Sequence, residues 1–483
     1  MRFNYQVNIT PQFRVLSDSQ IEEIFHSALE VLGRVGTRVH SDEALNLLRE
    51  AGCQISDGDR ARIPAWLVQD ALTTTPQRIA IAGRDRSSRV ILEKNKIYFG
   101  TGSDCPSLVD PYSGEVRKYT FEDIRNAARI SDALPHINFH MSLGLTSGVP
   151  AHTYDRHQFL AMLQGTSKPY VITAVDQEGL ADQYRMACEV LGGAEEFARA
   201  PLFVAYIEPS SPLSNSVEAV EKILYAAETG IPAIYTPCIM CGATGPVTLA
   251  GGMTQCLAES LVGIVLAQLK RKGAGVIIGG VESIVDMTTS VLAYGAPEMV
   301  LMSAAMTDVA KWLRLPVFST AGCSDSKTFD QQAAVESAMS VTVAALSGAN
   351  LIHDVGYLES GLLGSYDMLV MSNEVIGMAK HILGGISVTP ETLAVDVIEQ
   401  AGPGGQYLTQ PHTRKHFRSQ MWFPELMDRQ MRRSWEASGS YTLADRVRAK
   451  VKSILENHQP MAVPADVNAR LLDIVAAADA RHA

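Results

Sequence analysis

The sequence has few cysteines and fewer basic than acidic side chains, and both features exclude classes of protein. Its 483 residues include seven cysteines, an odd number scattered along the chain, which without an export signal indicates reduced thiols. Lysine and arginine total 41 against 52 aspartate and glutamate, giving a formal net charge of −11. This acidity argues against binding of nucleic acid or of an anionic membrane surface.

Long apolar runs are also lacking. Residues 1–20 do not contain the apolar core of a signal peptide. The most apolar segment, residues 261–280, is interrupted by Lys270, Arg271 and Lys272, and no run approaches the roughly 18 residues that predict a membrane span. We therefore expect a cytoplasmic protein.

A regular alternation of strands and helices begins near residue 96. Short apolar runs, typical of strands buried on both faces, occupy 96–102, 137–145, 169–175, 201–208, 231–240, 275–282, 316–322 and 350–357, with helical patterns between them. Eight such units predict an α/β fold, the (β/α)8 TIM barrel. The alternative is an open doubly wound sheet, but its glycine-rich phosphate loop is not evident in "GTGSDC" (100–105) or "GPGGQY" (402–407).

The flanking segments differ from this rhythm. Residues 1–94 mix short helices and strands, which predicts an N-terminal α+β extension to a barrel over 95–383. Residues 384–483 are predicted to be a mostly helical C-terminal extension that packs under the barrel or forms an oligomer surface. We expect a homo-oligomer.

Active sites of such barrels lie where the strands end, and three cysteines fall near those ends. Cys238 and Cys241 have the C-x-x-C spacing of zinc or redox sites, and Cys323 follows the seventh strand. No second C-x-x-C exists, and an extended strand would point Cys238 and Cys241 to opposite faces. Small buried thiols are the favoured interpretation.

Carboxylates form a second candidate group. Glu208, Glu282 and Asp325 lie near strand ends and suit acid–base catalysis or magnesium binding. Ion pairs and helix caps are the alternative, and Asp325 suits a cap as well as it suits catalysis.

Aromatic side chains form a third group. His353 shares a strand face with Tyr357, and further rings lie near other strand ends, at Tyr98, Phe99, Phe139 and Tyr206. Aromatic faces attract quaternary ammonium ions. Ordinary barrel core is the alternative interpretation.

Several long segments resemble the trimethylamine methyltransferase superfamily. They are 43–55, 62–72, 211–232, 245–269, "PVFSTAGCSDSK" (316–327), 356–378 and 444–460, in the family's order. The resemblance implies a (β/α)8 barrel that moves a methyl group from an amine to the cobalt of a corrinoid (cobalamin) on a partner protein. Archaeal relatives carry pyrrolysine where this sequence has Cys323. The sequence is therefore similar to the branch without pyrrolysine, whose known members demethylate quaternary amines, glycine betaine foremost.

Within the reaction that the resemblance implies, position at the strand ends suggests a role for each candidate. Asp104 and Glu208 would supply negative charge, Phe99, Tyr206 and Tyr357 would supply ring faces, and His353 or a backbone amide would bind a betaine carboxylate. Cys323 would border the methyl-transfer site without acting as a nucleophile. No metal and no tightly bound corrinoid are expected.

Other functions remain open at this point. A zinc-dependent corrinoid methyltransferase could use Cys238, Cys241 and Cys323 on a thiol or alcohol. A non-catalytic betaine-binding protein is a second alternative, and a lyase or aldolase is a third, although no lysine lies at a predicted strand end. The sequence does not choose among glycine betaine, proline betaine, carnitine and choline.

Overall fold

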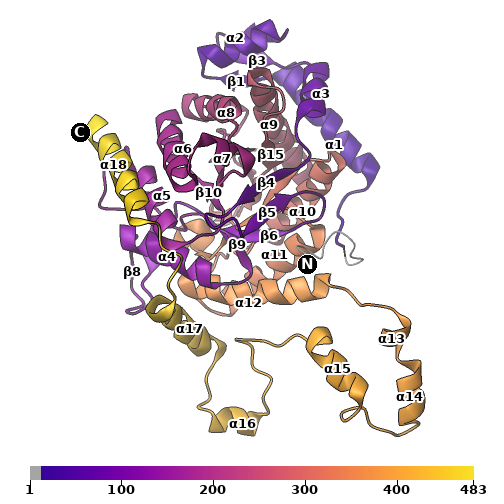
Figure 1. Cartoon of the computed structure of the whole chain (residues 1–483). Coiled ribbons are helices and arrows are strands. Elements are labelled where there is room, and N and C mark those ends of the chain that lie inside the picture. The colour runs from indigo at the N-terminus through magenta and orange to yellow at the C-terminus, as the bar shows by residue number, and fades with distance from the viewer. Residues whose placement is uncertain (1–11, 483) are drawn as a thin grey trace.

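A computed structural model describes residues 12–482, so most of the segment searched for an export signal lies outside the described residues. Eight parallel strands surround the centre of the molecule in chain order (Figure 1). They are β6 Tyr98–Thr101, β9 Ile137–Phe139, β10 Tyr170–Ile172, β11 Phe203–Ile207, β13 Ala233–Tyr235, β15 Val276–Gly279, β18 Val317–Thr320 and β19 Leu351–Val355. A parallel bridge between His140 and Tyr170 joins the two ends of the sheet. The predicted (β/α)8 barrel is confirmed, and an open sheet is excluded.

Helices between the strands cover the outside of the barrel. They are α4 Phe121–Ala133, α5 Tyr154–Gly165, α6 Gln177–Leu191, the short α7 Ala194–Arg199, α8 Val217–Thr229, α9 Leu249–Lys270, α10 Pro297–Trp312, α11 Gln331–Ser347 and α12 Tyr366–Leu383. Several begin at a side-chain cap: Thr120, Ser216, Asp330 and Ser365 each accept a first-turn backbone N–H. Asp330, and not Asp325, therefore caps α11.

Helix α9 requires a correction to the sequence analysis. An 18-residue window within it is long and apolar enough to cross a membrane, contrary to the expectation that no apolar run approaches this length. However, 72% of that window is buried inside the protein, and α9 packs against α1, α3 and α8. Its apolar side chains are thus accounted for by packing in the core.

The barrel interior is closed at the amino ends of its strands by a hairpin of β4 Ile79–Ala82 and β5 Arg89–Leu92. Ile79, Ile81, Val90 and Leu92 share one apolar cluster with the inward residues of the strands. The floor of the barrel is therefore sealed, which leaves the carboxyl ends of the strands as the open end.

The N-terminal region forms a layer beside α9. It contains α1 Asp18–Glu30, a π-helical turn Val31–Val35, β1 Thr37–Val39, α2 Asp42–Glu50, β2 Gln54–Ser56, β3 Arg60–Arg62 and α3 Ala65–Thr74. Strand β1 also pairs with β12 Ser214–Asn215 from the barrel region, so this layer is joined to the barrel. The boundaries 1–94, 95–383 and 384–483 stay a prediction.

Two small sheets stand at the open end of the barrel. One contains β14 Cys238–Cys241, β16 Val281–Val285 and β17 Leu292–Ala293; the other contains β7 Ser107–Val109, β8 Val116–Lys118, β20 Tyr357–Leu358 and β21 Leu363–Gly364. A 3-10 turn, Glu359–Gly361, follows β20. These sheets build walls above the ends of the barrel strands.

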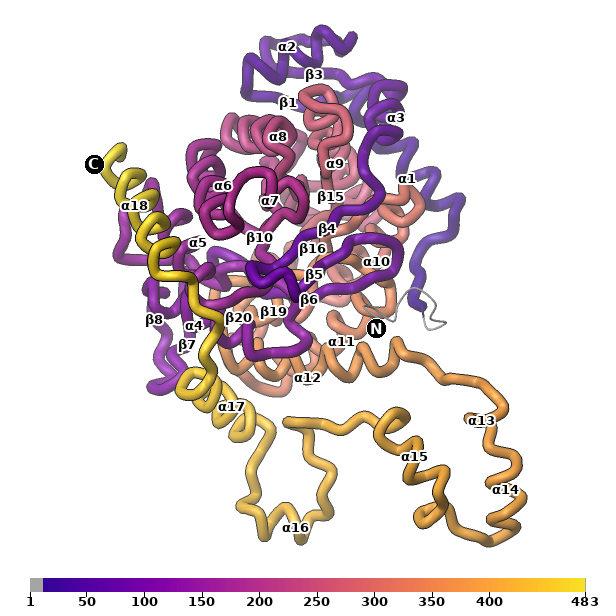
Figure 2. Tube along the Cα trace, viewed as in Figure 1, coloured from indigo at the N-terminus to yellow at the C-terminus, as the bar shows by residue number. Residues whose placement is uncertain are grey.

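The C-terminal region first leaves the body and then returns to it, as the trace in Figure 2 shows. It contains α13 Pro390–Leu393, α14 Val395–Ala401, α15 Pro411–Gln420, α16 Arg432–Ala437, α17 Leu443–Asn457 and α18 Ala465–Arg481. Helix α17 packs on α12 and α4, and α18 packs on α5 and α6. The C-terminal helices therefore pack around the side of the barrel.

Candidate active site

A cavity of about 260 Å³ lies at the carboxyl ends of the barrel strands. Its lining is acidic and aromatic, and the described residues that line it include no lysine or arginine. They are Ser103, Asp104, Tyr206, Glu208, Cys238, Val281, Leu292, Tyr294, His353, Asp354, Tyr357, Ser360 and Gly361. Five residues predicted from strand ends therefore lie together: Asp104, Tyr206, Glu208, His353 and Tyr357.

Three carboxyl groups share this cavity, and removal from bulk water raises the pKa of each. Burial raises the pKa of Asp354 to about 8, with a smaller rise from the negative charge of Glu208. Desolvation also raises the pKa of Asp104 and of Glu208. Glu208 lines the cavity and is exposed to solvent. With a pKa of about 8, which is set mainly by burial, Asp354 is mostly protonated at neutral pH.

Asp354 is held in an unusual backbone conformation. Its φ of 74° lies in the left-handed region, which non-glycine residues adopt at a cost, often at functional sites. Gly102 makes this position possible, because a Cβ there would lie 2.3 Å from Oδ1 of Asp354 and from the ring of Tyr357. The nearby hydroxyl of Tyr294 opposes part of the rise in the pKa of Asp354.

His353 faces the cavity as a neutral ring. Its Nδ1 lies 3.0 Å from the carbonyl oxygen of Ser319, so Nδ1 carries the proton and donates it there. Burial lowers the pKa of His353 to about 3. Its Nε2 lies 3.2 Å from Oδ2 of Asp354, outside good hydrogen-bond geometry. The ring thus brings no positive charge, and its binding of a betaine carboxylate stays a prediction.

Aromatic rings form part of the cavity wall. The hydroxyl of Tyr206 donates to Oε2 of Glu208 over 3.2 Å, and its ring centre lies 5.4 Å from that of Phe318. The hydroxyl of Tyr357 donates to the carbonyl oxygen of Ser103. These bonds fix the rings where their faces and edges border the cavity.

Tyr294 is a lining residue that the sequence did not reveal. It lies after β17, far along the chain from a barrel-strand end. Asp325 holds it in place, because its carboxylate accepts the backbone N–H groups of Tyr294 and Gly295 over 2.7 and 2.9 Å. Asp325 also accepts the hydroxyl of Ser360 over 2.7 Å. Asp325 therefore joins two loops of the cavity wall and is neither a cap nor a lining residue.

Phe99 lies elsewhere, which corrects the sequence analysis. It is fully buried in the cluster outside the barrel strands, with the ammonium of Lys380 6.0 Å from its ring centre. Its neighbour Tyr98 points into the barrel floor with Phe139. Phe99 therefore supplies no ring face to the cavity.

The cysteines and Glu282 have separate surroundings. Cys238 lines the cavity, whereas Cys241 is buried, as expected for residues three apart on one strand. The carboxylate of Glu282 accepts a hydrogen bond from the thiol of Cys256 over 3.0 Å. Burial raises the pKa of Glu282 to about 7. Within residues 12–482, no group of three His, Cys, Asp or Glu side chains is placed to hold a metal ion.

Cys323 lies behind the cavity wall. Its side chain is 2% exposed, and Sγ lies 3.5 Å from the carbonyl oxygen of Tyr294. Burial, with the nearby carboxyl groups of Asp354 and Asp325, raises its thiol pKa well above the ordinary value. A protonated, covered thiol is a poor nucleophile.

Comparison with known proteins places the chain in one family. The trimethylamine methyltransferase (MTTB) family matches residues 1–482. The chain is 35% identical over 460 residues to a trimethylamine methyltransferase MttB of Desulfitobacterium hafniense, covering 95% of this chain and 92% of that one. It is 30% identical over 473 residues to a glycine betaine methyltransferase of D. hafniense strain Y51, covering 97% and 98%.

A solved structure supports the fold. The Methanosarcina barkeri monomethylamine methyltransferase matches with a TM-score of 0.52 and 12% identity, over 93% of this chain and 90% of that chain. An open, acidic and aromatic cavity at the strand ends of this barrel accompanies the sequence match over nearly the whole length. The chain belongs to the trimethylamine methyltransferase (MTTB) family.

Proposed function

We propose that the protein removes one methyl group from a quaternary ammonium compound and passes it to Co(I) of a corrinoid on a partner protein. The observation that carries this proposal is the lining of the cavity, with three carboxyl groups, three tyrosines and no lysine or arginine among its described residues. Carboxylates and aromatic faces both attract an alkylated ammonium ion. The corrinoid would supply the nucleophile that takes the methyl group.

The chemistry asks little of the protein beyond binding and orientation. A quaternary nitrogen is already positive and leaves as a neutral tertiary amine, so the leaving group needs no proton. The residues of this chain would hold the ammonium group with one methyl directed to the barrel mouth. A carboxyl group with a raised pKa such as Asp354 would give up its proton when the cation binds.

The environment of Cys323 supports a quaternary substrate. This thiol is covered and protonated, and it cannot form the imine adduct of which the family's pyrrolysine is capable. A substrate that brings its own positive charge needs no such adduct. Cys323 would then only support the wall at Tyr294.

Glycine betaine is the substrate favoured by the resemblance, and a glycine betaine methyltransferase is among the relatives. Its carboxylate would have to be bound by backbone N–H groups of the cavity wall, since His353 is neutral and Asp354 would lose its proton to pair with the ammonium group. The lack of a basic lining residue favours a second candidate, a cation without a carboxylate such as choline. A cytoplasmic location is part of the proposal, because Co(I) requires a reducing compartment.

The test is methyl transfer to free cob(I)alamin. The protein is mixed with cob(I)alamin and each of glycine betaine, choline, carnitine, proline betaine and trimethylamine, and methylation of cobalt is followed by absorbance. We expect turnover of at least one quaternary amine and none of trimethylamine. Turnover of trimethylamine alone would refute the proposal. Stoichiometric zinc by metal analysis would instead favour the thiol or alcohol alternative.

A further inference from the structure

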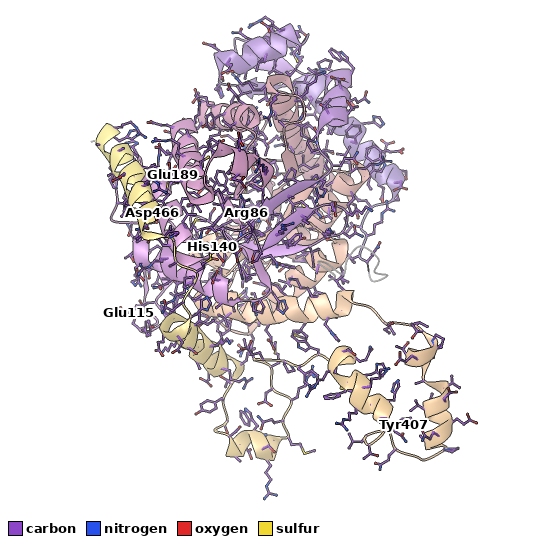
Figure 3. All side chains as sticks on the ribbon, viewed as in Figure 1. Arg86, Glu115, His140, Glu189, Tyr407 and Asp466 are labelled. Carbon is purple, nitrogen blue, oxygen red and sulfur yellow. The ribbon has the colours of Figure 1, made fainter. Side chains whose placement is uncertain are left out.

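Residues 385–421, here called the arm, extend away from the barrel between α12 and the next segment that packs on it (Figure 2). The arm contains α13, α14 and α15, and Figure 3 shows its labelled Tyr407 far from the barrel body. The chain returns to the body where the carboxylate of Glu374 accepts the backbone N–H groups of Glu425 and Leu426 over 3.0 and 3.1 Å.

The arm has a shape of its own, set by polar contacts within it. The carboxylate of Glu391 pairs with Lys415, and it lies 3.2 Å from Nε2 of His416. The hydroxyl of Thr413 donates to the carbonyl oxygen of Tyr407 over 2.6 Å. These contacts join α13 to α15, although no helix or strand of the described body packs extensively against either.

The apolar side chains of the arm point outward, which reverses the usual pattern. Six branched aliphatic side chains of the arm are more than half exposed: Ile386, Val388, Leu393, Val395, Ile398 and Leu408. The helices α13, α14 and α15 have 4, 7 and 10 residues, and isolated helices shorter than about 12 residues are marginal in water. Together these features indicate a segment that is covered by a partner.

The corrinoid protein would dock elsewhere, for a geometric reason. Helix α12 starts at Tyr366, beside the cavity mouth, and its 18 residues run back along the barrel to Leu383. At 1.5 Å a residue, the arm begins about 27 Å from the level of the mouth. A protein that presents cobalt to the cavity would be at the other end of the barrel.

The net charge of the arm permits a second copy of this chain as its partner. The acidic and basic side chains of the arm balance, as Glu391, Asp396 and Glu399 against Arg414, Lys415 and Arg418, whereas the whole chain carries −11. A neutral arm approaches an acidic body without net repulsion. An anionic membrane would gain no attraction from it.

The body, like the arm, exposes apolar side chains on its surface. The neighbouring helices α11 and α12 expose Val335, Met339, Met378 and Ile382 on their outer sides. This surface is here called the receiving face. Each helix contributes two residues four positions apart, which lie side by side on one helix face. The six arm side chains present on the order of 500 Å² of apolar surface, and docking would cover a similar area of the receiving face. Two exchanged arms and two receiving faces would therefore bury about 2,000 Å² in total, which suffices for a stable dimer.

We infer that the arm of one copy docks on the receiving face of a second copy, and that the exchange is reciprocal. The assembly is then a dimer, or a multiple of dimers, with both arm–face contacts related by twofold symmetry. This inference does not depend on the substrate or on methyl transfer.

Mass in solution tests it, by light scattering on a sizing column. The full-length chain is expected at twice its own mass or a higher even multiple. The double variant Ile386→Asp with Leu408→Asp, in the arm, and the double variant Val335→Asp with Ile382→Asp, on the receiving face, are each expected to be monomeric. Val116→Asp, at an exposed apolar residue of β8, is the matched control and should keep the wild-type mass.

Mixing the two double variants sharpens the test. Each retains the element that the other lacks, so the mixture is expected to form a dimer through one intact arm–face contact. Circular dichroism spectra like that of the wild type will show that both variants fold. A monomeric wild-type chain, an arm variant that keeps the wild-type mass, a mixture that stays monomeric, or capture of the corrinoid protein by the arm would each overturn the inference.

Discussion

The ionisation of Asp354 gives the sharpest test of the binding site. The probe is tetramethylammonium, which carries the quaternary nitrogen and nothing else. The pKa of Asp354 is raised from 3.8 to about 8 by burial, so its proton must leave before the carboxylate can pair with the cation. The affinity for tetramethylammonium should therefore rise with pH and level off above the pKa of the free protein.

The size of the effect follows from that pKa. About 1% of Asp354 is ionised at pH 6 and about half at pH 8, so the Kd should fall about fiftyfold over this interval, or about 2 kcal/mol. Near pH 7 close to one proton should be released for each cation bound. The Asp354→Asn variant should keep, at every pH, the weak affinity that the wild type shows at pH 6.

Isothermal titration calorimetry measures both quantities. Titrations at pH 6, 7, 8 and 9 give the Kd, and buffers of different ionisation enthalpy give the number of protons released. Asp70→Asn serves as a comparison, because Asp70 is an exposed residue of α3 and does not line the cavity. A Kd that is constant from pH 6 to 9, or a pH dependence that survives in Asp354→Asn, would show that Asp354 does not titrate with cation binding.

Three further predictions follow from the same geometry. Between pH 3.8 and about 8, native Asp354 retains a proton that the unfolded chain has lost, so the free energy of unfolding should fall as the pH rises through this window. Asp354→Asn should remove that loss and have a higher Tm than the wild type at pH 9. A cooperative thermal melt measures the difference. Gly102→Ala would place a Cβ 2.3 Å from Asp354 and the ring of Tyr357, so it should weaken tetramethylammonium binding at pH 8 by tenfold or more, while an unchanged Kd would mean that the wall yields freely. Cys323→Ser should keep methyl transfer from the quaternary substrate within about threefold, because a covered neutral thiol is no nucleophile; a loss of a hundredfold in kcat with an unchanged KM would give Cys323 a direct part in the chemistry.

The barrel was predictable because its strands and helices alternate in composition as well as in position. Strands buried on both faces leave continuous apolar runs, and caps such as Thr120 and Asp330 mark helix starts. The small sheets at the mouth were not predicted, because strands of two to five residues carry too little pattern. For example, the apolar pattern predicts one strand over 231–240, whereas the structure divides this segment into β13 and β14.

Part of the site followed from the fold rule that brings strand ends together. That rule does not say which way a side chain points. Successive residues of a strand point to opposite faces, and Phe99 points to the outside of the barrel instead of to the cavity. Asp354 was missed as a lining residue for the converse reason. Simple alternation would point it away from His353, but its φ of 74° and a local shift in the pairing of β19 with β6 turn it to the cavity. Tyr294 depends on a long-range contact with Asp325 that no local pattern records.

The central claim is demethylation of a quaternary ammonium compound, and isotope labelling tests it most directly. Glycine betaine and choline, each with three fully deuterated N-methyl groups, are incubated with the protein and cob(I)alamin, and the products are weighed by mass spectrometry. The account predicts a tertiary amine with two deuterated methyl groups and an equal amount of corrinoid bearing one deuterated methyl, from at least one of the two substrates. Intact quaternary amines, beside efficient demethylation of trimethylamine, would contradict it.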